Sequence, residues 1–406
     1  MINDPELIKG LMKQGGLLPQ EEMLEVARKK GSLFIGVPKE TSFQERRVAL
    51  VPEAVGLLVA NGHEVKVETK AGEKSNFSDN DYSEAGAQII YNTKEIFECD
   101  IVFKVAPITE EEADMLTGNQ TLISALQINI QPKEILQKLM EKKITAVAWD
   151  YMKDSEGGFP VVRTMGEIAG TTSVLIAAEL LSSFKGGKGI MLGGIAGVQP
   201  TEIVVLGAGT VAEFATRAAL GLGLSVKVFD NSLTRLRRLQ NDVGTRVYTS
   251  VLQPKVLAKA LMRADVVVGA IRSPFGRTPC VVSEEMVQNM KQGSVIVDVS
   301  IDQGGCFETS EITNHNDPTF EKYGVTHYCV PNIASRVSRT ASFALSNIFS
   351  PLLLEMGEHG GCKELIKNHH GFRNGVYIYK GTLTSEILGR IFDLKYKDME
   401  LLIMGL

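Results

Sequence analysis

Short apolar runs alternate with helically spaced apolar residues from residue 33 onward. In the first half, the runs predict strands at Leu33–Val37, Glu64–Glu68, Asp100–Val105, Thr121–Leu126 and Thr145–Ala148. Helical spacing predicts helices between them, near Glu53–Ala60, Asn80–Ala85, Glu110–Leu116 and Pro132–Lys142. Regular alternation of strands and helices is typical of an α/β protein.

The second half has more strongly apolar runs. They predict strands at Glu202–Leu206, Ser225–Phe229, Arg246–Thr249, Asp265–Ala270, Ser294–Val299 and Thr326–Val330. Nearly continuous apolar runs are expected of parallel strands that helices cover on both faces. Each half therefore predicts an open, mostly parallel sheet.

Two long helical patterns join the halves. Gly166–Phe184 is followed by the glycine-dense GGKGIMLGGIAGVQP, and Thr340–Gly357 follows the last predicted strand. We expect an α/β fold with two doubly wound Rossmann-like domains, a cleft between them and long linking helices. Residues 1–160 plus 341–406 would form one domain, with an N-terminal helical extension over Met1–Lys30, and residues 161–340 the other.

Composition excludes several classes of function. The 406 residues carry a net charge of −5 without a long basic run, which argues against nucleic-acid binding. Uninterrupted apolar stretches are too short for a membrane span. Met1–Lys30 contains several acids and resembles neither a signal nor a transit peptide, so we expect a soluble cytoplasmic protein. The five cysteines form no C-x-x-C pair, and no metal site is expected.

The segment Glu202–Asp230 has the features of a dinucleotide-binding unit. A predicted strand ends at Gly207-Ala208-Gly209, a helical pattern begins at Thr210 and Val211, and Asp230 ends the next strand. Glycines allow a tight turn and close approach of a pyrophosphate to the helix N-terminus. A carboxylate at Asp230 would bind ribose hydroxyls and repel a 2′-phosphate, so NAD is favoured over NADP. A folding role for the glycines and a solvated Asp230 are the alternatives.

Several motifs resemble the alanine dehydrogenase family, which is related to the NAD-binding domain of proton-translocating transhydrogenase. They are GVPKE, ERRVALVPE, AGEKS, DIVFKVAP, MGEIAG, GGIAGVQPTEIVVLGAGT, VIVDVSIDQGGCFE and HYCVPNI. The resemblance extends from about Leu33 to the C-terminus. It implies two α/β domains and NAD-dependent oxidative deamination of L-alanine to pyruvate and ammonium. Because relatives form homo-oligomers, it also implies a homo-oligomer.

The resemblance also implies roles for particular residues. Arg47 matches the substrate arginine, and Asp302, in the IDQGG loop, matches the catalytic aspartate. A surface arginine and a turn-forming aspartate are the alternatives. Further NAD contacts carry over to the following residues: Gly207, Ala208, Gly209, Thr210, Val211, Asp230, Arg235, Ile271, Val299, Ser300, Ile301, Val330, Asn332 and Ile333. Arg235 could equally be a solvated cation of its helix.

The chain departs from the family at two substrate positions. The family has a second lysine shortly after the one that matches Lys104, whereas this chain has Ala106 there. The family's catalytic histidine is Gln127, and glutamine cannot carry a proton at neutral pH. Lys104 and Gln127 are retained as candidate substrate-binding residues, with a solvated strand lysine as the alternative for Lys104.

Three functions fit these observations. One is an alanine dehydrogenase that uses Arg47, Asp302 and Lys104, with Gln127 orienting substrate or water. The second is a dehydrogenase or imine reductase for a different amino acid, because loss of a cation and an imidazole reshapes the substrate pocket. The third is a transhydrogenase-like NAD-binding protein without amino-acid dehydrogenase activity.

Overall fold

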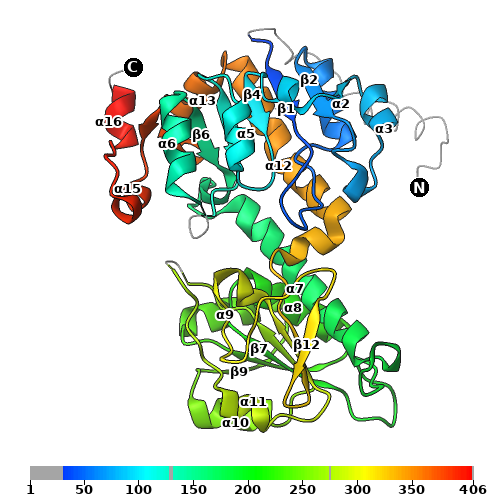
Figure 1. The fold of residues 1–406 in the computed structure, drawn as a ribbon. Helices are drawn as coiled ribbons and strands as arrows, with labels where there is room; N and C mark the ends of the chain where they lie inside the picture. Colours follow the sequence, from blue (N-terminus) through cyan, green and yellow to red (C-terminus); the bar gives the residue numbers. More distant parts are fainter. Residues whose placement is uncertain (1–30, 128–130, 274–275, 405–406) are drawn as a thin grey trace, which may run out of the picture.

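The computed structural model describes residues 31–127, 131–273 and 276–404, and the expected N-terminal helices over Met1–Lys30 lie outside them. Two domains lie one above the other, and the long helices α7 and α12 run between them (Figure 1). Each domain is built on one sheet. The predicted fold class, α/β with two Rossmann-like domains, is confirmed by these sheets and by the structural relatives described below.

The first sheet has the strand order β15-β14-β6-β5-β4-β1-β2-β3. Its strands are β1 (Phe34–Val37), β2 (Glu64–Glu68), β3 (Gln88–Ile90), β4 (Ile101–Phe103), β5 (Thr121–Ser124), β6 (Thr145–Ala148), β14 (Val376–Tyr379) and β15 (Thr382–Leu383). The pairs from β3 to β6 are parallel, whereas β14 runs antiparallel to both β6 and β15.

Helices and two separate apolar clusters cover this sheet. The helices of this region are α2 (Pro52–Ala60), α3 (Asp79–Glu84), α4 (Thr93–Ile96), α5 (Glu110–Met115), α6 (Lys133–Glu141), α13 (Cys362–Asn368), α14 (His370–Arg373), α15 (Glu386–Phe392) and α16 (Met399–Met404). Sequence explains several of their ends. Thr109 and Glu112, for example, form a reciprocal capping box at the start of α5.

The second sheet has the order β12-β13-β11-β10-β7-β8-β9. Its strands are β7 (Glu202–Leu206), β8 (Ser225–Phe229), β9 (Tyr248–Ser250), β10 (Val266–Gly269), β11 (Val295–Asp298), β12 (Thr319–Lys322) and β13 (Val325–Tyr328). The antiparallel edge strand β12 is the exception in a parallel sheet. Helices α8 (Thr210–Gly221), α9 (Leu233–Val243), α10 (Pro254–Leu261) and α11 (Glu284–Gln288) belong to this domain.

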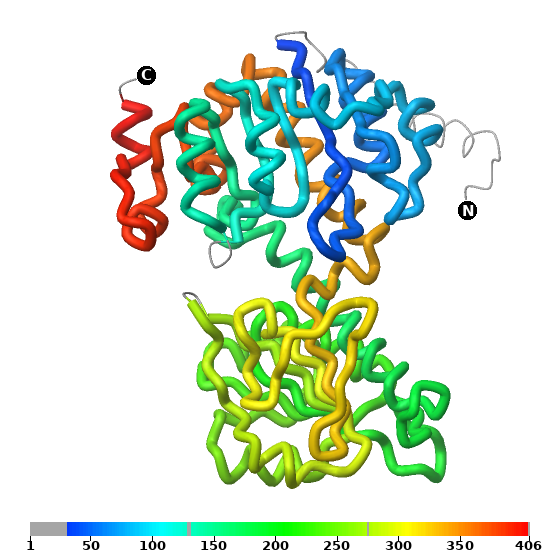
Figure 2. The backbone as a smooth tube through the Cα atoms, viewed as in Figure 1, coloured from blue at the N-terminus to red at the C-terminus, as the bar shows by residue number. Residues whose placement is uncertain are grey.

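The linking helices are α7 (Pro160–Leu181) and α12 (Ser338–Glu358). α7 begins six residues before the predicted start, because Pro160 suits the first helical turn, where its missing N–H is not needed. Gly170 lets α7 pack closely on α8, since a side chain there would collide with the Val211 carbonyl. The smooth trace in Figure 2 shows both helices passing through the narrow region between the domains.

Most predicted strands and helices lie within a few residues of the observed ones. Four observed strands were not predicted: β3, β12, β14 and β15. Three of them, β3, β12 and β15, are short edge strands, and β14 pairs antiparallel with β15; short strands of this kind give little periodic signal. Among the described residues, no helix is long and apolar enough to cross a membrane.

Candidate functional site

The glycine turn after β7 has open space where a dinucleotide would lie. Gly207 has a φ of 109°, and a side chain there would collide with the carbonyl oxygen of Ala270, so glycine is required. Gly209 is the N-cap of α8, and a Cβ on it would meet nothing within 4 Å. The N-terminus of α8 therefore borders open space beside Gly209, as pyrophosphate binding requires.

Asp230 lies beside this glycine turn and is bonded to it. It is only 8% exposed, so the solvated alternative is wrong. Its Oδ2 accepts a hydrogen bond from Ala208 N at 2.8 Å, and Oδ1 accepts one from Ser232 N at 2.7 Å. Arg235 is more than half exposed, with Nη1 3.8 Å from Asp230 Oδ2. The carboxylate is thus fixed beside the glycine turn, where it could accept hydrogen bonds from the hydroxyls of an adenosine ribose.

The loops that follow β10 and β11 are tied together. Ile271 N donates to Ser300 Oγ at 3.0 Å, and Ser300 lies in the short 3₁₀ helix η4 (Val299–Gln303). Buried Asp298 anchors the start of η4 by accepting hydrogen bonds from Ser300 N and Cys306 N. Burial raises the pKa of Asp298, and these hydrogen bonds partly offset the effect. Together these bonds fix the position of η4, which carries Asp302.

Asp302 lies on the side of η4 that faces Asn332. Its side chain is accessible to solvent, and its Oδ1 accepts a hydrogen bond from Asn332 N at 2.9 Å. Enough protein surrounds the carboxyl that burial raises its pKa, whereas the Asn332 N–H and the charge of Arg47 act in the opposite direction. The second carboxylate oxygen has no hydrogen-bond donor among the described residues.

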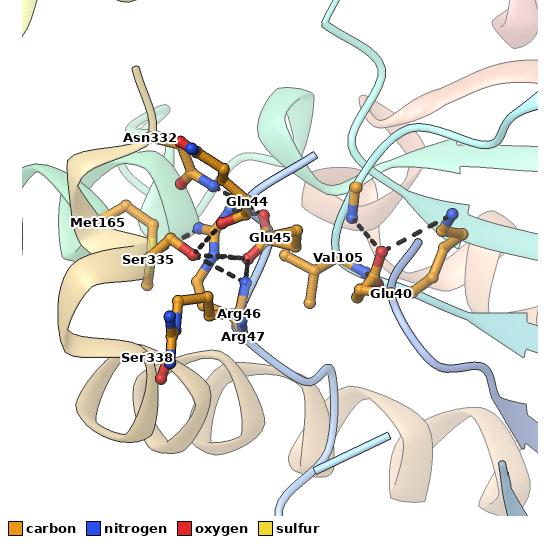
Figure 3. Close-up of polar contacts among 12 residues, drawn as sticks. Glu40, Gln44, Glu45, Arg46, Arg47, Val105, Met165, Asn332, Ser335 and Ser338 are labelled. Atoms are coloured by element: carbon orange, nitrogen blue, oxygen red, sulfur yellow. Dashed lines mark hydrogen bonds and ion pairs between the residues drawn. The ribbon is translucent and has the colours of Figure 1, made fainter. Parts of the chain in front are cut away.

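Asn332 connects Asp302 with the predicted substrate arginine in the other domain. Its Nδ2 donates to Glu45 Oε2 at 2.8 Å, and Glu45 in turn binds Arg47 (Figure 3). Arg47 donates from Nε to Oε1 at 2.8 Å and from Nη2 to Oε2 at 2.6 Å. Arg47 is 5% exposed, so the surface-arginine alternative is wrong.

Burial alone would raise the pKa of Glu45, but the Arg47 guanidinium holds it below its ordinary value. The structure therefore brings Arg47 and Asp302 to one junction, with Glu45 and Asn332 between them. Glu45 is two residues before Arg47 in the ERRVAL motif, a spacing that could have suggested the pair.

Backbone contacts hold this junction in place. His315 N donates to Gln44 Oε1 at 2.6 Å, and Arg46 N donates to Ser335 Oγ at 2.8 Å. Ser335 Oγ donates to Gln44 O at 3.0 Å. The loop between β1 and α2 is consequently fixed against the start of η5 (Ile333–Val337).

Lys104 is fully buried and held by protein carboxylates, so the solvated-lysine alternative is wrong. Its Nζ lies 2.5 Å from Glu112 Oε2 and 3.8 Å from Glu40 Oε2. Glu40 also accepts a hydrogen bond from Val105 N. Burial raises the pKa of Glu40 to about 7, although Lys104 acts to lower it. Substrate contact by Lys104 stays a prediction.

Gln127 follows the end of β5 in the left-handed region, with a φ of 46°. Its backbone N and that of Leu126 donate to the two oxygens of Asp150, at 3.2 and 3.0 Å. Burial raises the pKa of Asp150, whereas these two N–H groups and the charge of Arg272 lower it. Arg272 belongs to the other domain. Sequence reasoning missed both Asp150 and Arg272, because neither lies in a motif.

Comparison with known proteins decides the family. The models "Alanine dehydrogenase/PNT, N-terminal domain" and "Alanine dehydrogenase/PNT, C-terminal domain" match residues 36–169 and 173–386. A protein named alanine dehydrogenase from Methanococcus maripaludis is 38% identical over 370 residues, which cover 91% of this chain and 99% of the relative. The chain belongs to the alanine dehydrogenase/PNT family.

Other relatives agree with this family. Alanine dehydrogenase 2 from Staphylococcus aureus is 37% identical over 90% of this chain and 98% of the relative. A solved L-alanine dehydrogenase matches with a TM-score of 0.83 and 37% identity, over 88% of this chain and 99% of that one. A transhydrogenase from Sinorhizobium meliloti shares the fold, with a TM-score of 0.74 at 23% identity over 86% and 98% of the two chains.

Membership of the alanine dehydrogenase/PNT family confirms the resemblance stated from the motifs. The individual site residues remain predictions. Of the candidate cofactor contacts, Gly207, Ala208, Gly209 and Asp230 lie at one turn, and Ile271, Ser300 and Asn332 lie at the adjoining loops. No cluster of potential metal ligands occurs within the described residues.

Proposed function

We propose that the protein catalyses the NAD-dependent oxidative deamination of L-alanine to pyruvate and ammonium. The observation that carries this proposal is the chain of contacts from Asp302 through Asn332 and Glu45 to Arg47, which joins the two domains. Named alanine dehydrogenases that align over about nine-tenths of the chain support the same conclusion.

NAD fits the turn described above. The open space outside Gly209 suits a pyrophosphate, and the carboxylate of Asp230 suits an unphosphorylated ribose. When bound, NAD would accept the hydride that leaves the substrate Cα. Residues 161–340 would hold the cofactor, and residues 1–160 with 341–406 the amino acid. We further propose a cytoplasmic homo-oligomer.

The protein's own residues would position the substrate and move protons. Asp302 would accept a proton on the oxygen that Asn332 does not bind, and its raised pKa suits that role. Arg47 would attract the substrate carboxylate through the part of its guanidinium that Glu45 does not bind. Gln127 would orient the substrate or the attacking water by hydrogen bonding.

A dehydrogenase or imine reductase for another amino acid is the second candidate. It is favoured by the buried ion pair of Lys104 with Glu112, because that lysine already has a carboxylate partner in the protein. A transhydrogenase-like NAD-binding protein without dehydrogenase activity is the third, because Gln127 cannot carry a proton.

One assay separates the three candidates. Purified protein is incubated with NAD and a panel of L-amino acids, and NADH is followed by its absorbance. We expect turnover with L-alanine. Turnover with a different amino acid alone supports the second candidate, and NAD binding without turnover supports the third.

The role of Asp302 is tested by Asp302→Asn, which keeps the shape and removes the proton acceptor. We expect kcat to fall by roughly 100-fold or more, since acid–base catalysis contributes about 10²- to 10⁴-fold. NAD affinity, measured by calorimetry, should change little. Unchanged alanine turnover would show that Asp302 is not the catalytic group.

A further inference from the structure

Protein carboxylates already pair with both cations predicted to bind the substrate. Glu45 binds Arg47 through two hydrogen bonds, and Glu112 lies 2.5 Å from Lys104. An amino acid or a 2-oxo acid nevertheless carries a carboxylate that must find a cation when it leaves water. A second cation whose guanidinium or ammonium group has no carboxylate partner would therefore add to the grip that Arg47 can provide.

Arg272 lies beside Asp302 because of the backbone bonds on either side of it. Ile271 N donates to Ser300 Oγ, and Ser273 N donates to Gln303 Oε1, both at 3.0 Å. Ser300 and Gln303 flank Asp302 on η4. The segment around Arg272 is therefore held against the helix that carries the predicted catalytic aspartate.

The Arg272 side chain is exposed, and within the described ranges it has no ion-pair partner. Its charge acts on Asp302 in its own domain and on Asp150 in the other domain. The exposed guanidinium is therefore available to an anionic ligand.

The carboxyl of Asp150 already has hydrogen-bond donors in its own domain. Both oxygens of Asp150 accept backbone hydrogen bonds from Leu126 and Gln127, so Asp150 does not need the guanidinium as a donor. The same bonds hold Gln127 in its left-handed conformation, with an exposed side chain. An exposed guanidinium therefore belongs to the segment held against η4, and an exposed amide lies beside Asp150.

We propose that Arg272 is a substrate-binding residue, which holds the carboxylate of the 2-amino or 2-oxo acid from the cofactor-binding domain. This inference rests on the proposed function and names a residue that determines specificity for it. The planar guanidinium can bind both carboxylate oxygens at once, which fixes the direction of the acid as well as its charge. Gln127 completes recognition with a neutral hydrogen bond.

The test compares Arg272→Gln and Arg272→Lys with the matched control Arg277→Gln. Arg277 is an exposed arginine of the same loop, whose Nη2 lies 3.4 Å from the Gly304 carbonyl oxygen. Calorimetry measures NADH binding first, and then pyruvate binding to the NADH-bound protein. Neither measurement requires turnover.

We expect Arg272→Gln to weaken pyruvate binding roughly 10- to 100-fold, the usual value of a hydrogen bond to a charged group, while NADH affinity stays unchanged. Arg272→Lys should recover part of the loss, because it restores charge without the planar fork. Arg277→Gln should match the wild type in both measurements. An unchanged pyruvate affinity for Arg272→Gln, or a loss of NADH affinity alone, overturns the proposal.

Turnover distinguishes this inference from the proposed function. If wild-type protein binds pyruvate through Arg272 but does not oxidise L-alanine, the proposed function fails and the binding role stands. If wild-type protein oxidises L-alanine and Arg272→Gln keeps the wild-type KM for alanine, the binding role fails alone. Absence of pyruvate binding by the wild-type NADH complex also overturns the binding role.

Discussion

Glu40 is a buried carboxyl whose protonation couples stability to pH. Its pKa is raised by burial to about 7, above the ordinary 4.5. Between these values the folded protein holds a proton that the unfolded chain releases, so this carboxyl stabilises the fold at low pH. The contribution is lost as the pH rises from about 4.5 through about 7.

Glu40→Gln should therefore remove a pH dependence. A glutamine stays neutral, keeps an oxygen for Val105 N, and does not lose stability over that pH range. We expect the melting temperature of the variant, relative to wild type, to rise between pH 5 and pH 8 at constant ionic strength. Glu111→Gln, at an exposed position of α5, is the control and should show a constant difference. A constant difference for Glu40→Gln would contradict the assignment.

Sequence could locate Arg47 and Asp302 because each lies in a contiguous motif. It could not reveal both partners of Lys104, since Glu40 precedes it by 64 positions and Glu112 reaches it only after the chain has turned from β4 into α5. Nor could it show that the segment around Arg272 is held against η4, because those hydrogen bonds form only in the folded domain. Local motifs thus predict which residues belong to the site, whereas partners and charge state depend on long-range packing.

The packing of α7 against α8 sets the geometry of the cofactor turn. Replacement of glycine by alanine can be compared at three positions of these helices, and each position has different surroundings. A Cβ on Gly170 would collide with the Val211 carbonyl and crowd Ala215 N, whereas a Cβ on Gly209 or Gly221 would meet nothing within 4 Å. Gly209 faces the proposed pyrophosphate site, and Gly221 lies at the far end of α8.

Gly170→Ala should destabilise the protein, although alanine normally stabilises a helix by about 1 kcal/mol relative to glycine. Overpacking against backbone costs about 1–3 kcal/mol, which outweighs that gain. Gly209→Ala should keep the melting temperature within a few degrees and weaken NADH binding at least tenfold. Gly221→Ala should leave NADH binding unchanged and should not lower the melting temperature, because the added Cβ meets no neighbour. A Gly170→Ala protein as stable as Gly221→Ala would show that the helices can separate without cost.

Elements were predictable where apolar periodicity was strong. The buried strands of the second sheet, such as β7 and β10, are nearly uninterrupted valine and isoleucine runs, and their observed ranges match the predicted ones closely. β14 is buried at all four positions, yet it lies among loops and short helices near the C-terminus. Its residues show no alternation of apolar and polar positions that would predict a strand. Its place beside β6 comes from tertiary pairing.

The chain passes between the two domains through the helices α7 and α12. The polar junction around Asn332 joins the domains by hydrogen bonds. Asn332 takes the left-handed conformation, with a φ of 56°, and makes one bond to each domain. Its backbone N binds Asp302, and its side chain binds Glu45. The side-chain bond links the loop that carries Arg47 to the domain that carries Asp302.

Asn332→Gly should remove that link without straining the backbone, because glycine readily adopts positive φ. A hydrogen bond to a charged group contributes about 1.5–3 kcal/mol, so we expect kcat/KM for L-alanine to fall roughly 10- to 100-fold. Amide exchange in residues 41–51, measured by mass spectrometry, should become faster, since this loop loses a contact with the other domain.

Asn119→Gly is the matched control, because Asn119 also has a positive φ, 57°, but lies in the loop before β5. It should leave both exchange in residues 41–51 and alanine turnover at wild-type values. If Asn332→Gly speeds exchange without lowering kcat/KM, the junction holds the domains together but does not position the reacting groups. If neither quantity changes, α7 and α12 alone fix the domains, and the Asn332–Glu45 bond carries no coupling between them.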